Sequence, residues 1–271
     1  KNNLSWEVHY EMTPIFNSRN LISSSFETGN SAYRTYDLDK ILSSNESKNK
    51  TYQNLDRLNI QFQFGHSDLT IGRQSIDLGS ARMIKPTDIF LPFNLQTLNT
   101  EYRIGVDAFR YQTHLSELSE IDVGVIFGSE GKSENSAAYL RIQTNFRGAD
   151  LKVSMIEYAR QTLYSFGIET AIKKSGFWFE VADVQGDEHY TLVSLGLDRA
   201  LSETLFAQIE YHHNGAGTDD PSAYARKINE IAYRKGGVTL FGKDYFLPSI
   251  SAQISPLLNL SFGAVFNLTD S

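Results

Sequence analysis

The chain has 271 residues, of which 41% are hydrophobic and 12% aromatic, and it contains no cysteine. Without cysteine there are no disulfides, thiolate metal sites or cysteine nucleophiles, and no apolar run approaches the length of a transmembrane helix. A net charge of −7 without a Lys/Arg stripe argues against nucleic-acid binding. The length suits one large β-barrel or up to two ordinary domains.

Alternation of apolar and polar residues begins at the first segment, where Leu4, Trp6 and Val8 share one parity and Ser5 and Glu7 share the other. Side chains alternate between the two faces of a strand, so this pattern predicts one apolar and one polar face. About fourteen segments of about ten residues follow this rule, which is the length of membrane-barrel strands. In chain order the predicted strands are 4–13, 32–41, 55–64, 68–76, 104–112, 121–128, 137–145, 150–159, 163–172, 177–185, 190–198, 204–212, 243–254 and 258–268.

The connections alternate between short turns, such as 65–67 and 146–149, and longer links at 43–54, 77–103 and 213–242. Outer-membrane barrels have short periplasmic turns and longer extracellular loops. The predicted fold is therefore all-β: a transmembrane antiparallel up-and-down β-barrel. Aromatic residues near strand ends also favour a membrane barrel; they are Trp6, Tyr10, Phe177, Tyr211, Tyr245 and Phe266. The alternative is a soluble β-sandwich or lipocalin-like barrel, which alternation alone does not exclude.

By this alternation, strand 4–13 descends to the periplasmic side, as does strand 55–64, and strand 258–268 ascends. A barrel with both termini in the periplasm then needs a further strand at each end. We therefore expect residues 1–271 to be a single barrel domain truncated at both ends, with about sixteen to eighteen strands in the full protein.

Charged residues of inward parity are the candidate pore-lining residues. The basic ones precede the acidic ones along the chain, which in a closed barrel would place two opposite arcs and a transverse field across the pore. These residues are Arg57, Arg110, Arg141, Lys152, Glu169, Glu180, Asp198 and Glu210. The alternative is a set of solvated, locally paired charges.

The long stretch 77–103 is a candidate constriction loop. Its apolar residues, including Ile84, Ile89 and Phe90, would be costly in water, and folding into the lumen would cover them. The charged residues that would then stand at the constriction are Arg82, Lys85, Asp88, Glu101 and Arg103. A surface loop packed on neighbouring loops is the alternative.

Within 213–242, Asp219 or Asp220, Pro221 and Gly236 are signals for a helix that could cover the mouth. The adjacent His212 and His213 would point to opposite faces, so a metal site is not predicted. No catalytic motif is present: the consecutive His66, Ser67 and Asp68 belong to a tight turn rather than to a triad.

The stretch from Thr70 to Asn94, with the segment Glu101–Tyr111, resembles a pattern in porin-like bacterial outer-membrane proteins related to the alginate-export porins. The matching residues are Gly72, Arg73, Gln74, Ile76, Gly79, Pro86, Asp88, Phe90, Pro92, Tyr102, Arg103, Gly105, Val106, Asp107 and Ala108. The resemblance implies a channel-forming barrel in the outer membrane of a Gram-negative bacterium, and no enzyme activity.

We therefore expect an outer-membrane channel for passive passage of small hydrophilic or organic solutes, without a cofactor. The expected partners are the lipid bilayer and lipopolysaccharide, small solutes, and further copies of the chain or an envelope protein. The alternative function is a barrel sheath around a partner, such as a multihaem cytochrome in an electron conduit.

Overall fold

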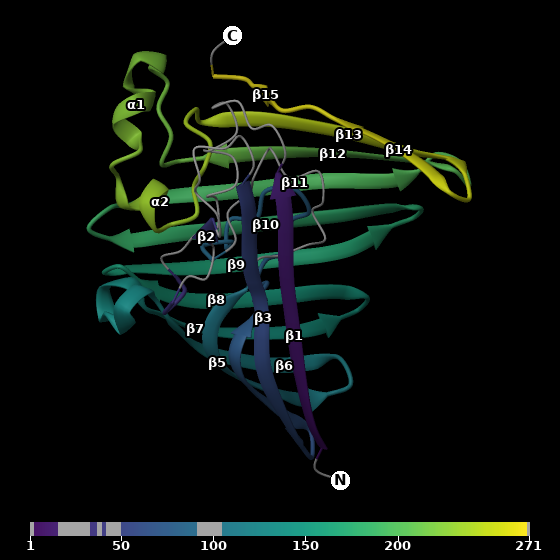
Figure 1. Ribbon diagram of the computed structural model, residues 1–271. Helices are drawn as coiled ribbons and strands as arrows, with labels where there is room; N and C mark the ends of the chain where they lie inside the picture. Colours follow the sequence, from purple (N-terminus) through teal and green to yellow (C-terminus); the bar gives the residue numbers. More distant parts are fainter. Residues whose placement is uncertain (1–2, 16–32, 37–39, 42–49, 91–104, 270–271) are drawn as a thin grey trace.

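The computed structural model describes residues 3–15, 33–36, 40–41, 50–90 and 105–269. These residues form one 15-stranded antiparallel sheet, in the order β1-β3-β4-β5-β6-β7-β8-β9-β10-β11-β12-β13-β14, with β2 added to β3 and β15 added to β13 (Figure 1). The strands are β1 (Asn3–Ile15), β2 (Lys40–Ile41), β3 (Lys50–Phe64), β4 (Ser67–Gln74), β5 (Val106–Ser116), β6 (Ser119–Phe127), β7 (Ala137–Phe146), β8 (Ala149–Tyr158), β9 (Gln161–Ile172), β10 (Ser175–Gly186), β11 (Tyr190–Ala200), β12 (Leu205–Asn214), β13 (Asp244–Ser255), β14 (Leu258–Gly263) and β15 (Phe266–Asn267). The short helices are η2 (Ser129–Gly131), η3 (Ser133–Asn135), η4 (Pro221–Ala223), α1 (Tyr224–Lys227) and α2 (Ile231–Arg234).

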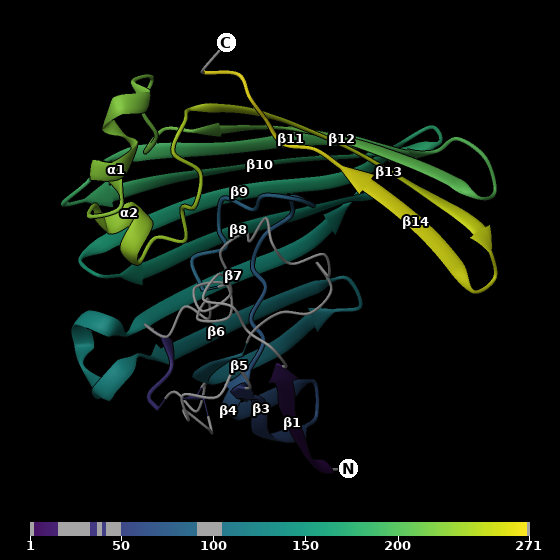
Figure 2. The same ribbon diagram turned by 45° about the horizontal axis from the view of Figure 1, so that its top comes forward.

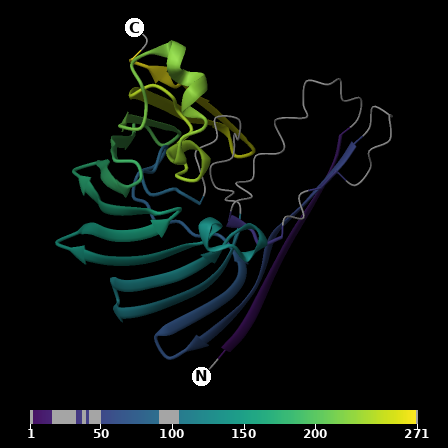
Figure 3. The same ribbon diagram turned by 90° about the vertical axis from the view of Figure 1, so that its left-hand side faces the viewer.

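The sheet curves around an open interior, with the purple and blue strands β1 and β3 on one side and the teal and green strands on the other (Figure 3). Strands β1 and β14 end the strand order, and the described residues show no pairing between them. No helix in the described ranges is long and apolar enough to cross a membrane.

All predicted strands except 32–41 correspond to observed strands. In that segment, the described residues Tyr33–Tyr36 lie outside any strand, and β2 covers only Lys40–Ile41. The prediction is wrong for Tyr33–Tyr36, because the Arg34 side chain is held in a buried polar cluster, described below; residues 32 and 37–39 lie outside the described residues.

The missing strand changes one predicted direction. Strand β1 pairs directly with β3 in antiparallel register, so 4–13 runs opposite to 55–64 and not in the same direction. The strand-direction argument for a further strand before residue 1 therefore does not hold. The extent of the domain stays a prediction.

The two faces of the sheet differ as the alternation predicts. Large hydrophobic side chains stand exposed on the outer face of strand after strand, including Trp6, Ile60, Phe109, Ile142 and Phe166. Apolar surface repeated over so many strands is costly in water and suits a bilayer. Tyr245, one of the aromatic residues expected near the membrane interface, is instead buried, and its hydroxyl accepts a hydrogen bond from the Gly242 amide.

The inner face is polar towards the short turns and apolar towards the long loops. At the loop end the inward residues of neighbouring strands form a core, which includes Ile126, Ile156, Leu163 and Val184. This core packs against Ser75–Phe90, the segment that follows β4 and that we call the inner segment. It is the blue trace on the inner side of the curved sheet in Figure 2.

Candidate functional site

Two buried carboxylates of the wall hold the main chain of the inner segment. Glu180 of β10 is 1% exposed. Its Oε2 accepts the amides of Ser80 (2.5 Å) and Ala81 (2.7 Å), and its Oε1 accepts the amide (2.9 Å) and the hydroxyl (2.7 Å) of Thr87. Four donors converge on this one side chain, so its negative charge is matched by main-chain dipoles in place of water.

Glu210 of β12 holds the next residues of the inner segment in the same way. It accepts the amides of Arg82 (3.1 Å), Met83 (3.1 Å) and Ile84 (2.7 Å), and the indole Nε1–H of Trp178 (2.8 Å). Trp178 is fully buried on β10, where its ring lies over Gly196 of β11. A side chain at position 196 would occupy the space of the indole, so the glycine makes room for the tryptophan.

The four predicted basic wall residues are on the inner side, but each has an acidic neighbour. Arg57 pairs with Asp56, and Arg110 pairs with Asp122 at 2.6 Å. Further along, Arg141 pairs with Glu120 at 2.8 Å and with Asp122 at 3.0 Å, and Lys152 pairs with Glu169 at 2.8 Å. The arrangement is a set of local ion pairs. The transverse field across the pore stays a prediction. Because each of these cations has a carboxylate beside it, fewer unpaired charges are left to produce the field than the sequence suggests.

Three of these cations also bind the main chain of the inner segment, and the longest of the bonds runs from Arg110 Nη1 to the Ser75 carbonyl at 3.5 Å. Arg141 Nη1 donates to the Asp77 carbonyl at 2.8 Å, and Lys152 Nζ donates to the Gly79 carbonyl at 2.8 Å. Carbonyls of residues 77–79 thus face cations of β7 and β8, whereas amides of residues 80–87 face carboxylates of β10 and β12. The polarity of the wall matches the polarity of the peptide groups placed against it.

The predicted constriction residues separate into four groups. Arg82 keeps a side chain that is 48% exposed, lies 3.8 Å from Glu169 and 3.9 Å from Asp198, and stacks 5.4 Å from the centre of the Trp178 ring. Lys85 is nearly buried and forms an ion pair with Asp77 at 2.6 Å. Asp88 lines a pocket beside the segment. Glu101 and Arg103 lie outside the described residues.

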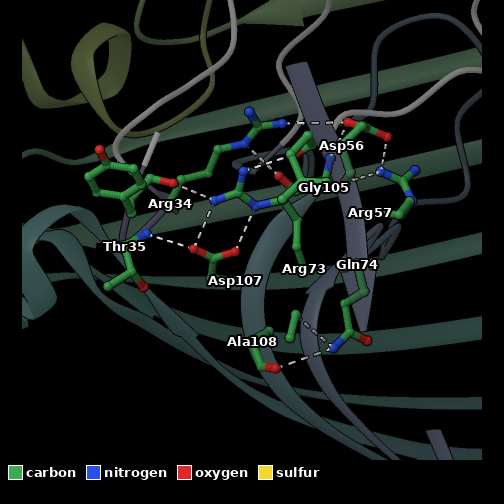
Figure 4. Close-up of polar contacts among 12 residues, drawn as sticks. Arg34, Thr35, Asp56, Arg57, Arg73, Gln74, Gly105, Asp107 and Ala108 are labelled. Carbon is green, nitrogen blue, oxygen red and sulfur yellow. Dashed lines mark hydrogen bonds and ion pairs between the residues drawn. The ribbon is translucent and has the colours of Figure 1, made fainter. Parts of the chain in front are cut away.

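The residues that carry the sequence motif meet at the loop end of β3, β4 and β5 (Figure 4). Arg73 donates to both oxygens of Asp107 (2.8 and 3.1 Å) and to the carbonyls of Leu55 (2.8 Å) and Tyr36 (2.6 Å). Gly72 has a positive φ of 114°, and a Cβ there would lie 2.3 Å from the Leu58 carbonyl oxygen. The motif therefore fixes the point where the chain leaves β4 for the interior.

A second buried arginine extends this cluster. Arg34 is 1% exposed, donates to the Gly105 carbonyl at 2.9 Å, and lies 3.4 Å from Asp56. Asp56 also accepts the Gly105 amide at 2.9 Å. A Cβ at position 105 would lie 2.1 Å from the Asp56 carbonyl oxygen, which requires glycine there. The cluster thus anchors the end of the long loop where it enters β5.

The loop 215–243 covers the loop end of the interior. The predicted helix is interrupted at Glu230, which is extended (ψ 153°), so that η4 and α1 precede it and α2 follows it. Glu188, in the turn between β10 and β11, accepts the amides of Ile231 (2.8 Å) and Ala232 (3.0 Å). As predicted, Asp220 caps the first helical turn by accepting the Ser222 amide at 3.0 Å. Burial raises the pKa of Tyr233 to about 12. Burial likewise raises the pKa of Tyr33 well above its usual range, so that its phenol stays protonated and donates to the Lys235 carbonyl at 2.9 Å.

His212 and His213 point to opposite faces, as predicted. His212 is buried at 2.8 Å from the Ser194 hydroxyl, whereas His213 lies 2.8 Å from Asp244. Within the described ranges, no cluster of three His, Asp or Glu side chains could hold a metal ion. The partners that sequence reasoning missed are Asp56, Glu120, Asp122, Trp178 and Ser194. Inward parity is the signal that marks Glu120, Asp122, Trp178 and Ser194.

No protein-family model matches the chain, and no curated protein does. Among solved structures, the chain is similar to OccD3 (OpdP) of Pseudomonas aeruginosa, with a TM-score of 0.52 and 10% identity over 79% of this chain and 58% of that one. It is equally similar to OccAB4 of Acinetobacter baumannii, with a TM-score of 0.52 and 11% identity over 85% of this chain and 65% of that one. The chain thus spans less than two thirds of the length of either structure.

These neighbours are outer-membrane porins, and the likeness concerns the fold. The coarser part of the resemblance, a porin-like barrel, is confirmed, whereas nothing in the comparisons concerns the alginate-export porins in particular. The predicted location in the bacterial outer membrane agrees with this fold. The described chain is a transmembrane, antiparallel, up-and-down β-sheet of the outer-membrane barrel type.

Proposed function

We propose that the protein is an outer-membrane channel through which small hydrophilic or organic solutes pass passively. One observation carries the proposal: the inner segment crosses the inner face of the barrel wall and is tied there by Glu180 and Glu210. A segment in this position narrows the space that the wall encloses. The similarity to outer-membrane porins supports the same role.

We further propose that Arg82 is the charged group of the inner segment that a passing ion meets. Its guanidinium is half-exposed, and its contacts with Glu169 and Asp198, at 3.8 and 3.9 Å, are long for ion pairs. The neighbouring cation Lys85, by contrast, is tied to Asp77 at 2.6 Å. The narrower resemblance to the alginate-export porins and the absence of enzyme activity stay predictions.

The sheath hypothesis receives no comparable support. A sheath needs an interior wide enough for a folded partner, and the inner segment occupies part of that interior. Reconstitution of the purified protein into planar bilayers tests the two functions. Stable single-channel currents without any added partner support the channel, whereas the absence of currents together with co-purification of a haem protein would favour the sheath.

A further inference from the structure

The outer face of the sheet stays apolar as far as the short turns. Phe146 ends β7, Ile172 ends β9, and Leu201 lies in the turn between β11 and β12; each of these side chains is more than half exposed. The turns follow one another along the right-hand end of the sheet in Figure 1. Phe146 and Ile172 have the parity of the outward residues Ile142 and Phe166, so they continue the apolar surface that faces the bilayer.

Four cations stand beside these apolar side chains. All four are exposed, and none forms a hydrogen bond or an ion pair with a described residue; they are Arg147, Lys173, Lys174 and Arg199. The Arg147 guanidinium lies over the Phe146 ring, 5.2 Å from its centre. On the next hairpins, Ser175 is paired with Ile172 of β9 and with Arg199 of β11. Basic and apolar side chains thus alternate around Ser175.

The carboxylates near these turns leave a net positive charge on the outer side. Asp150, near the start of β8, has inward parity and accepts a hydrogen bond from Asn145 at 2.8 Å. Asp198 also faces the interior, where it accepts a main-chain amide at 3.1 Å. Glu203 is exposed in the turn that contains Leu201. One exposed carboxylate against four cations makes this surface complementary to phosphate groups.

The height of the apolar surface places these cations at the edge of the bilayer. On β10 the outward apolar residues end at Asp183, whose carboxylate binds neighbouring polar side chains. Ser175 and Asp183 are eight positions apart, which is about 26 Å at about 3.3 Å per residue. A strand tilt of about 40° reduces this to about 20 Å across the membrane, less than the apolar band of about 25 Å in outer-membrane barrels. The hydrocarbon therefore reaches the short turns, and the cations lie at the level of the lipid phosphates.

We propose that this surface, the turn-end patch, binds an anionic phospholipid of the leaflet that faces the periplasm. The patch consists of Phe146, Arg147, Ile172, Lys173, Lys174, Arg199 and Leu201. The lipid phosphate lies among the four cations, and its acyl chains pack on the apolar side chains. The site faces the membrane and does not require that solutes cross the barrel, so it goes beyond the proposed function.

Fluorescence quenching by spin-labelled lipids tests the proposal. The chain has no cysteine, so Ser175→Cys carries a single bimane fluorophore in the patch. Ser67→Cys is the matched control, because Ser67 is also the first residue of its strand but has Phe64 and Thr113 as cross-strand partners. In phosphatidylcholine vesicles, equal amounts of spin-labelled phosphatidylglycerol and spin-labelled phosphatidylcholine are compared. We expect phosphatidylglycerol to quench Ser175→Cys at least about threefold more strongly, and both lipids to quench Ser67→Cys alike.

Replacing all four cations by glutamine should remove the preference at Ser175→Cys. The double variant Lys173→Gln/Lys174→Gln should weaken it, and serves if the fourfold variant does not fold. Equal quenching by the two lipids at Ser175→Cys, or an undiminished preference in a folded glutamine variant, would overturn the proposal. The absence of quenching by either lipid would also overturn it, because the patch would then lie outside the bilayer. The measurement needs no ion current, so its outcome is separate from the bilayer test of channel function.

Discussion

Replacing Glu180 by glutamine should release the inner segment from the wall. Each carboxylate oxygen of Glu180 accepts two hydrogen bonds from the segment: Oε2 from Ser80 and Ala81, and Oε1 from the amide and hydroxyl of Thr87. The amide of glutamine keeps one acceptor oxygen and places an NH₂ group against the other two donors. Two charge-assisted bonds are thus lost whichever way the amide turns.

A hydrogen bond to a charged group contributes about 1.5–3 kcal/mol, so the variant loses about 3–6 kcal/mol of attachment. With about 1.4 kcal/mol for each factor of ten, detachment becomes about 10² to 10⁴ times more favourable. Single-channel recording should show larger and noisier currents, because the segment leaves the wall part of the time. The matched control is Asp183→Asn on the same strand, whose carboxylate contacts Gln185, His189 and Thr191 and no other residue of the described ranges.

The reasoning is refuted if folded Glu180→Gln protein conducts with the same amplitude and noise as the unmodified channel. A change of equal size in Asp183→Asn would also refute it, since that carboxylate does not contact the inner segment. Heat-modifiable migration in gel electrophoresis identifies the folded fraction of each preparation, so that a loss of folding is not mistaken for a change in the channel.

The remaining predictions concern Arg82, the Ser80–Gly167 contact and Arg73. Arg82→Glu should move the reversal potential towards cation selectivity by reversing the charge at the constriction; an unchanged potential would contradict its position there. A Cβ at Gly167 would lie 2.9 Å from Ser80 Cβ, which is closer than the roughly 3.5–4.5 Å of a disulfide, so a small movement apart brings the two positions into range. The double variant Ser80→Cys/Gly167→Cys should then oxidise to one cross-link, and two free thiols by mass spectrometry would show that the segment lies elsewhere. Arg73→Lys keeps the charge but not the fork that holds Asp107, and should lower the free energy of unfolding in urea by about 1–3 kcal/mol; no loss would mean that charge alone suffices.

The alternation of the sequence predicts the sheet well because each strand faces two different environments. Leu58, Ile60 and Phe62 are exposed on the outer face, as their parity requires. The inward parity of Glu180 and Glu210 is also correct. The sequence could not show which groups these two carboxylates bind. Their partners are mainly main-chain amides of the inner segment, and main-chain amides leave no pattern in the sequence of side chains.

The strand predicted over 32–41 fails at its described residues Tyr33–Tyr36 for a related reason. Alternation there looks like that of its neighbours, but Arg34 is drawn into a buried cluster with Asp56 and Gly105, which are distant in the chain. Two inward-facing glycines, by contrast, are explained by the residues that face them on the neighbouring strands. Gly124 lies opposite Tyr139 and Gly196 lies opposite Trp178, so each glycine accommodates the ring of its cross-strand partner.

The central claim, that the inner segment stands in the conducting path, is tested most directly at Arg82. The chain has no cysteine, so Arg82→Cys introduces a single thiol at a half-exposed position of the segment. The account predicts that a bulky methanethiosulfonate reagent lowers the single-channel current in one step, whereas the same reagent on Leu257→Cys, at the fully exposed turn after β13, leaves it unchanged. An unchanged current with complete modification of Arg82→Cys, verified by mass spectrometry, would contradict the account.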